Sequence, residues 1–154
     1  MHDNFRWLFI SSIVLFFSCS EDPDCSQDIP HDQIIVTFYD KDELELKQAE
    51  FDYVFNADGT FIHNKDSADA PDSFSSIQLE LNPSSDTSLF FFVTGVKTDT
   101  LRLIYSRKME WLSVECGPNF TYDELMIFDH TFDSASLINS IIEPEIDESV
   151  RLFN

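Results

Sequence analysis

Several residue types are scarce in this chain of 154 residues, and their scarcity excludes classes of protein. Only three glycines are present, too few for the glycine-rich loops that hold the phosphate groups of nucleotides. Nine Lys and Arg stand against 29 Asp and Glu, which gives a formal net charge of −20. Contacts to nucleic-acid phosphates need clustered basic side chains, so this balance argues against a nucleic-acid partner. It also disfavours binding to anionic lipid through a basic patch.

No apolar run in the sequence is long enough to span a bilayer. Residues 7–17 form an uncharged, mostly apolar run, but a transmembrane helix needs about 20 such residues. A run of this length near the N-terminus is typical of a signal peptide. Ser18 and Cys19 follow it directly, and an apolar run, a small residue and a Cys together resemble the lipobox of bacterial lipoproteins.

That resemblance implies cleavage before Cys19, a diacylglyceryl group on its sulfur and acylation of the new amino terminus. We therefore expect attachment to the outer membrane through acyl chains such as palmitate. Two features depart from the usual pattern: Phe17 stands where small residues are commoner, and Arg6 is the only basic side chain before the apolar run. The alternative is an ordinary secretory signal followed by an unrelated Cys. Under either interpretation the mature chain is exported.

The sequence predicts three parts: a signal peptide over residues 1–18, an acidic tether over 19–30, and a single domain over 31–154. Residues 20–24 read Ser-Glu-Asp-Pro-Asp. An acidic stretch just after the lipid anchor resembles the signal that sends lipoproteins of Bacteroidetes to the outer cell surface. This favours a surface-exposed position over one facing the periplasm. The alternative is a solvated spacer that is acidic like the rest of the chain.

The body of the chain has the pattern of a β protein. Residues 33–39 are β-branched and aromatic, and Asp58-Gly59 lies between two such runs, which predicts a hairpin. Residues 64–73 read as a loop. A turn is expected between residues 105 and 112, and a break in the strand pattern at 117–119. Further strands are expected at 74–81, 89–93, 101–105, 112–116 and 125–128. Only Leu137, Ile138, Ile141 and Ile142 show helical spacing. We predict an all-β, antiparallel β-sandwich of about eight to nine short strands, with at most one short helix near residues 134–143.

The three cysteines fit an oxidising compartment. With Cys19 assigned to lipid, Cys25 and Cys116 remain as an even pair, for which a disulfide is expected. Such a bridge would close a long loop and stabilise the domain by up to ~4.5 kcal/mol. It would also fix the end of the tether to the domain. The alternative is two unpaired thiols.

Short motifs along the mature chain resemble an uncharacterised family of small Bacteroidetes lipoproteins with a domain of unknown function. The resemblance implies the compartment and makes the Cys25–Cys116 pairing more credible, but it supplies no catalytic residue. Its motifs are the lipobox Cys19, Asp24-Cys25, Phe38-Tyr39-Asp40, Leu79 to Pro83, Asp99 to Tyr105, Glu115-Cys116-Gly117 and Thr131 to Ser134.

Recognisable catalytic chemistry is lacking. The sequence has no nucleophile elbow, no zinc-protease motif and no dinucleotide fingerprint, and His31, His63 and His130 are each isolated. We expect no catalytic residues, no cofactor and no metal. The alternative function is binding of calcium or glycan by acidic loops at residues 40–43, 56–59 and 66–72, although the hairpin already explains Asp58-Gly59.

One short motif suggests a covalent modification that exported proteins of the same bacteria carry. Asp66-Ser67-Ala68 resembles the Asp-Ser/Thr-aliphatic acceptor of their exported glycoproteins, so Ser67 is a candidate O-glycosylation site; Asp99-Thr100-Leu101 and Asp133-Ser134-Ala135 also match but lie in or near predicted strands. The sequence thus predicts a lipid-anchored, non-enzymatic interaction or structural module of the cell envelope. Its protein or glycan partner is not specified by any motif.

Overall fold

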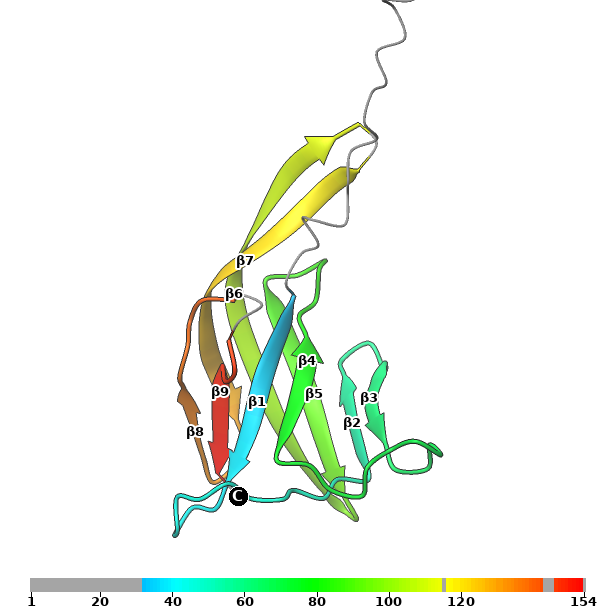
Figure 1. Ribbon diagram of the computed structural model, residues 1–154, viewed down its shortest axis with the longest axis vertical. Helices are drawn as coiled ribbons and strands as arrows, with labels where there is room; N and C mark the ends of the chain where they lie inside the picture. The colour runs from blue at the N-terminus through cyan, green and yellow to red at the C-terminus, as the bar shows by residue number, and fades with distance from the viewer. Residues whose placement is uncertain (1–31, 115, 143–145, 154) are drawn as a thin grey trace, which may run out of the picture.

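A computed structural model describes residues 32–114, 116–142 and 146–153 as a β-sandwich (Figure 1). No helix occurs in these residues, and hence none that could span a membrane. The predicted signal peptide and tether lie outside the described residues. The strands are β1 (Gln33–Tyr39), β2 (Tyr53–Asn56), β3 (Phe61–Asn64), β4 (Ser76–Glu80), β5 (Thr87–Thr94), β6 (Lys97–Ser113), β7 (Gly117–His130), β8 (Ser134–Leu137) and β9 (Val150–Phe153).

The strands form two sheets that pack face to face. The four-stranded sheet has the order β4-β1-β9-β8, and the five-stranded sheet has the order β3-β2-β5-β6-β7. Every neighbouring pair is antiparallel except β1 and β9, which run parallel with Val36 opposite Val150. The predicted all-β sandwich and its number of strands are confirmed, with one parallel pair inside the antiparallel arrangement.

Buried and outward-facing side chains alternate along strands such as β5, and phenylalanine supplies many of the buried ones. In β5, Phe90 and Phe92 are buried, whereas Phe91 between them points to the outer face of its sheet. The ring centroid of Phe92 lies 5.3 Å from that of Phe51 and 5.2 Å from that of Phe132. Aromatic rings at this spacing bury large apolar areas, which explains how a small domain uses so many Phe side chains.

The hairpin of β6 and β7 is longer than the sequence predicts. The turn expected between residues 105 and 112 is not formed, because β6 continues to Ser113, and the expected break at 117–119 is instead the start of β7. Pairing along the whole hairpin satisfies the backbone of the polar stretch that reads as a turn. Beyond the sandwich the two strands project as a twisted ribbon, which we call the arm: residues 107–114 and 116–121 (Figure 1).

The short helix allowed near residues 134–143 is not formed in its described part, 134–142. Ser134–Leu137 instead form β8, which pairs with β9, and the Ile138 N–H donates to the Ser149 carbonyl at 2.9 Å. The helical spacing does not mark a buried face, since Ile138 and Ile141 are about half exposed and only Ile142 is buried. Sheet pairing therefore outweighs the local pattern.

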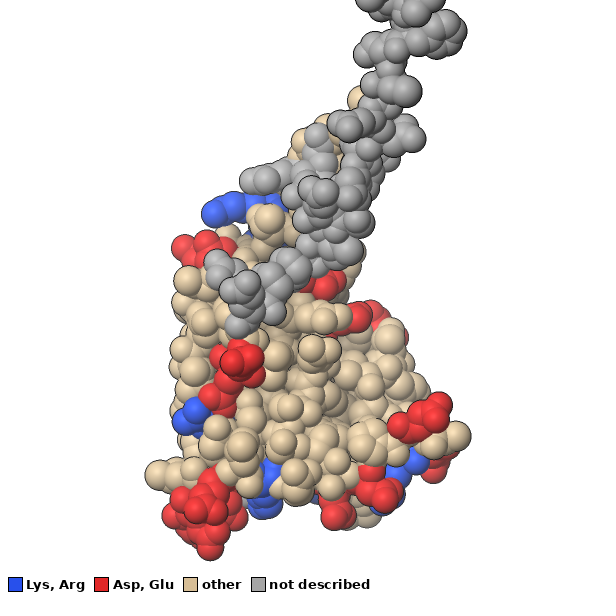
Figure 2. Space-filling model, viewed as in Figure 1, with Lys and Arg blue, Asp and Glu red and all other residues tan. Residues whose placement is uncertain are grey.

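Acidic side chains gather on the loops at the end of the sandwich away from the arm (Figure 2). The loop after β1 carries Asp40, Asp42, Glu43 and Glu45, and the loop after β3 carries three further Asp residues. Asp99 is an exception, because its side chain is buried and lies 2.9 Å from the Lys97 ammonium. Most of the described acids are thus solvated.

Candidate functional site

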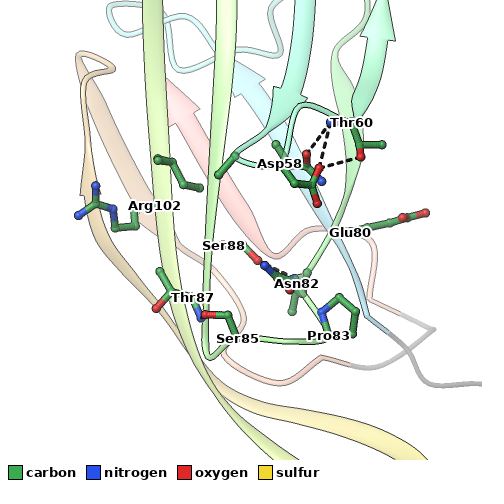
Figure 3. A pocket seen from close by; sticks show the side chains of 13 residues that line it. Asp58, Thr60, Glu80, Asn82, Pro83, Ser85, Thr87, Ser88 and Arg102 are labelled. Carbon is green, nitrogen blue, oxygen red and sulfur yellow. Dashed lines mark hydrogen bonds between the residues drawn. The ribbon is translucent and has the colours of Figure 1, made fainter.

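A polar pocket lies between the β2–β3 hairpin and the loop that joins β4 to β5 (Figure 3). Its volume is about 430 Å³. A neighbouring hollow of about 330 Å³ shares Asn56, Thr60 and Glu80 with it. β3 and β4 are each an edge strand of their sheet, so the pair of hollows follows one open side of the sandwich.

The β2–β3 hairpin supplies one wall of the pocket. Gly59 adopts φ +88°, a value that favours glycine, and this closes the tight turn predicted from Asp58-Gly59. The Asp58 carboxylate accepts hydrogen bonds from the Thr60 hydroxyl at 2.7 Å and from the Thr60 N–H at 3.0 Å. These bonds hold the pKa of Asp58 below its usual value, so the group stays ionised near neutral pH.

The β4–β5 loop supplies the opposite wall and is fixed by its own hydrogen bonds. The Asn82 side-chain oxygen accepts from the Ser84 N–H at 2.8 Å, while the Asn82 N–H donates to the Ser88 hydroxyl at 2.8 Å. The Tyr105 hydroxyl donates to the Asn82 carbonyl at 3.0 Å. The Arg107 guanidinium donates to the Pro83 carbonyl. The loop is therefore held by β5 and β6 of the five-stranded sheet and presents a pre-formed surface.

The lining is suited to hydrogen bonding. It offers amides from Asn56 and Asn82, hydroxyls from threonine and serine, two carboxylates from Asp58 and Glu80, and one guanidinium from Arg102. None of the thirteen lining residues is His or Cys, and the buried Ser88 hydroxyl is bonded to Tyr105. No nucleophile with an adjacent base is seen among them.

The acidic loops use their carboxylates locally. Asp40 accepts from the Asp42 N–H at 2.8 Å and from the Glu43 N–H at 3.1 Å, and Asp66 accepts from the Tyr53 hydroxyl at 3.0 Å. Within the described residues, no group of three or more His, Cys, Asp or Glu could hold a metal ion. In the part of the chain that the structure describes, the acidic loops therefore do not form such a group.

The described histidines are packed against backbone rather than gathered into a site. His63 is buried, its Nε2 lies 3.0 Å from the Phe51 carbonyl, and its ring lies edge-on to Phe74. The Nδ1 of His130 lies 3.1 Å from the Phe132 carbonyl. His31 lies outside the described residues.

The predicted modification sites are widely separated. Cys116 lies in the turn at the tip of the arm, where its N–H donates to the Ser113 hydroxyl at 2.9 Å. Ser67 is exposed in the loop after β3, and its N–H donates to the Asn64 carbonyl. Cys19 and Cys25 lie outside the described residues, so the lipid anchor and the Cys25–Cys116 bridge stay predictions, as does glycosylation at Ser67.

Sequence reasoning missed the pocket, although it placed both loops that form it. The Asp58-Gly59 hairpin and the Asn82-Pro83 turn each carry a local signal, but they are far apart in the chain. Their meeting depends on the order of strands in two different sheets, which no local pattern encodes.

Comparison with known proteins gives one match. Residues 53–154 match the sequence model of a protein family that is described as a family of unknown function (DUF6452). The matched region contains both pocket loops and the whole arm. No curated protein and no solved structure matches the chain.

Proposed function

Since the chain belongs to a family of unknown function (DUF6452), its own residues must carry the functional argument, and we propose that it is a lipid-anchored, non-enzymatic binding module of the cell envelope of Bacteroidetes. The single observation that carries the binding role is the pre-formed polar pocket, whose lining offers many hydrogen-bonding groups without a nucleophile and base. The ionised Asp58 is likewise unsuited to act as a general acid, which requires a raised pKa.

The anchor rests on the sequence before the domain. A short apolar run ends at Ser18-Cys19, and twelve residues separate Cys19 from Asp32, where the described chain begins. Extended, such a spacer reaches ~40 Å or more, which is enough to hold the domain clear of lipid headgroups. Several acyl chains on one cysteine give stable attachment, because each buried methylene contributes about 0.8 kcal/mol.

Replacing the lipidated cysteine tests the anchor. We expect Cys19→Ala to release the protein from the membrane fraction and to abolish labelling by radioactive palmitate. Cys25→Ala is the matched control, because it removes a cysteine of the same tether and should leave both labelling and fractionation unchanged. Unchanged membrane attachment and labelling of Cys19→Ala would contradict the proposal.

The position on the membrane is part of the same proposal. The acidic residues after Cys19 support export to the outer surface. Protease added to intact cells should then digest the protein, whereas a periplasmic control protein survives. Digestion only after the outer membrane is broken would place it on the periplasmic side.

The pocket favours a neutral, polyhydroxylated ligand, and we propose an oligosaccharide. Amides, hydroxyls and carboxylates together can pair with the donors and acceptors of sugar hydroxyls. Two carboxylates stand against one guanidinium in the lining, and the whole chain carries −20, so an anionic ligand would be repelled. The calcium alternative has no ligand cluster in the described residues to support it.

Titration with a panel of neutral oligosaccharides, including cellohexaose, maltoheptaose and chitohexaose, tests this ligand class by calorimetry. We expect saturable binding of at least one, weakened tenfold or more by Asn56→Ala or Glu80→Gln. Asp72→Asn is the control, because it removes an exposed acid outside the pocket. Absence of binding to every member, or binding that the pocket variants leave unchanged, would contradict the glycan proposal. A melting temperature raised by calcium but not magnesium would instead favour the calcium alternative.

A further inference from the structure

The two strands of the arm differ in how deeply their side chains are buried. On β6, Met109 and Trp111 are 64% and 65% exposed. On β7, Asn119 is only 9% exposed and Phe120 is half-buried, while Pro118 and Thr121 are exposed. The Arg107 guanidinium lies 5.1 Å from the Phe120 ring centroid and covers part of that ring, so Asn119 is the residue of the arm whose burial is least expected in a two-stranded ribbon.

The buried side-chain oxygen of Asn119 is a second feature of this surface. Its Oδ1 atom is buried and has no hydrogen-bond partner among the described residues. A buried acceptor of this kind costs about 1–3 kcal/mol unless a donor satisfies it. In addition, β7 is one of the two edge strands of the five-stranded sheet, so its outer backbone groups along the arm face no further described strand.

The described chain begins next to this surface. The Asp32 carbonyl accepts a hydrogen bond from the Leu81 N–H at 2.6 Å, at the end of the sandwich from which the arm leaves (Figure 1). Burial raises the pKa of the Tyr122 phenol and the nearby charge of Asp32 raises it further. Asp32, where the described chain begins, therefore lies near Tyr122 at the base of the arm.

The reach of the preceding segment matches the length of the arm. Asp32 lies seven positions after Cys25, and an extended chain over seven positions spans about 23–25 Å. Tyr122 lies six positions after Cys116, a span of about 20 Å along β7 and its turn. If Cys25 lay beside Cys116, Ile29 would lie level with Phe120, because each is four positions further along the chain.

We propose that residues 25–31 dock along the β7 side of the arm, over Asn119 and Phe120, and that Cys25 is joined to Cys116 at its tip. In the bridge the two thiols lose two protons and two electrons to a thiol–disulfide oxidant of the envelope, which is reduced to its dithiol. The arm is then a stalk that fixes the tether to the sandwich. The tip of the arm is then the end nearest the membrane. This orientation rests on the proposed anchor at Cys19, whereas the docking of residues 25–31 does not depend on that anchor.

Hydroxyl-radical footprinting with residue-level mass spectrometry tests the docking on the full chain. In the Ile29→Ser/Cys25→Ser variant we expect Phe120 to be oxidised at least threefold faster than in the unchanged protein. Phe61 and Phe128, which are exposed and lie outside the arm, are internal controls whose rates should not change. Ile29→Ser alone, which keeps the bridge, should give a smaller increase in the same direction.

Three different results would overturn the proposed docking. Equal oxidation of Phe120 in all three proteins would overturn the docking, and so would Cys25 and Cys116 peptides that are alkylated without reductant. Protection of Phe120 that rises with protein concentration would assign the surface to a second copy of the chain and would also overturn it. If Cys19 is not labelled by palmitate, the expected oxidation rates and the expected alkylation of Cys25 and Cys116 stay the same. Failure of the anchor is therefore separable from failure of the docking.

Discussion

The hydroxyl oxygens of Tyr105 and Ser88 lie 2.8 Å apart in the interior of the sandwich, directly behind the Asn82 turn that forms one wall of the pocket. Tyr105 also donates to the Asn82 carbonyl, and Ser88 accepts from the Asn82 N–H. Two strands of one sheet thereby hold the loop that leads from the other sheet. The shape of the pocket thus depends on hydrogen bonds in the core behind it.

Removing the Tyr105 hydroxyl should destabilise the domain. Tyr105→Phe keeps the ring but leaves buried polar groups of Ser88 and Asn82 without this partner, at a cost of about 1–2 kcal/mol in the free energy of unfolding. Urea denaturation measures the change. Tyr53→Phe is the control, because that hydroxyl bonds Asp66 at the surface and its loss should cost less. Equal effects of the two substitutions would contradict the role given to Tyr105.

Alkaline pH should weaken the fold through the same residue. Burial raises the pKa of Tyr105 and of Tyr122 above the value of about 10 expected in the unfolded chain. The folded state then holds these protons more tightly, so their contribution is complete below about pH 10 and is lost as pH rises through the folded-state pKa values. The urea midpoint should fall above about pH 10, and Tyr105→Phe should flatten that fall. A midpoint whose pH dependence is the same in the variant would refute this explanation.

Neighbouring phenylalanines of β5 should respond very differently to truncation. Phe92 is 1% exposed and packs against three buried rings, so Phe92→Ala should cost about 3–5 kcal/mol. Phe91 faces outward and stacks on Phe55 with centroids 5.1 Å apart, so Phe91→Ala should cost well under half as much. Thermal and urea unfolding compare the two. A larger loss at Phe91 would mean that the outer face of the five-stranded sheet is covered in solution.

The pocket hairpin should be sensitive to a side chain at Gly59. A Cβ there would meet no atom within 4 Å, so the penalty of Gly59→Ala comes only from its φ of +88° and should be about 1–2 kcal/mol. Gly59→Asn should cost less, because Asn tolerates positive φ better. Unfolding measurements rank the two variants, and an Ala variant as stable as the unchanged protein would show that the turn differs from the one described.

The sequence predicts the sandwich because the strands are rich in β-branched and aromatic residues, with burial alternating along β5, and because Asp58-Gly59 marks its hairpin. It fails in the arm, where the polar residues around Arg107 and Lys108 read as a turn although continuous pairing with β7 keeps them extended. It fails again at Ile138 and Ile141, whose spacing is helical but whose side chains are not buried. The pocket depends on contacts between distant segments, which a single sequence does not display.

The N-terminal peptide of the protein isolated from membranes tests the central claim most directly. If the chain is a lipid-anchored module, mass spectrometry will find a mature N-terminus at Cys19 that carries a diacylglyceryl group and an amide-linked acyl chain. A protein that still begins at Met1, or one that begins at or near Cys19 without lipid, would contradict the account.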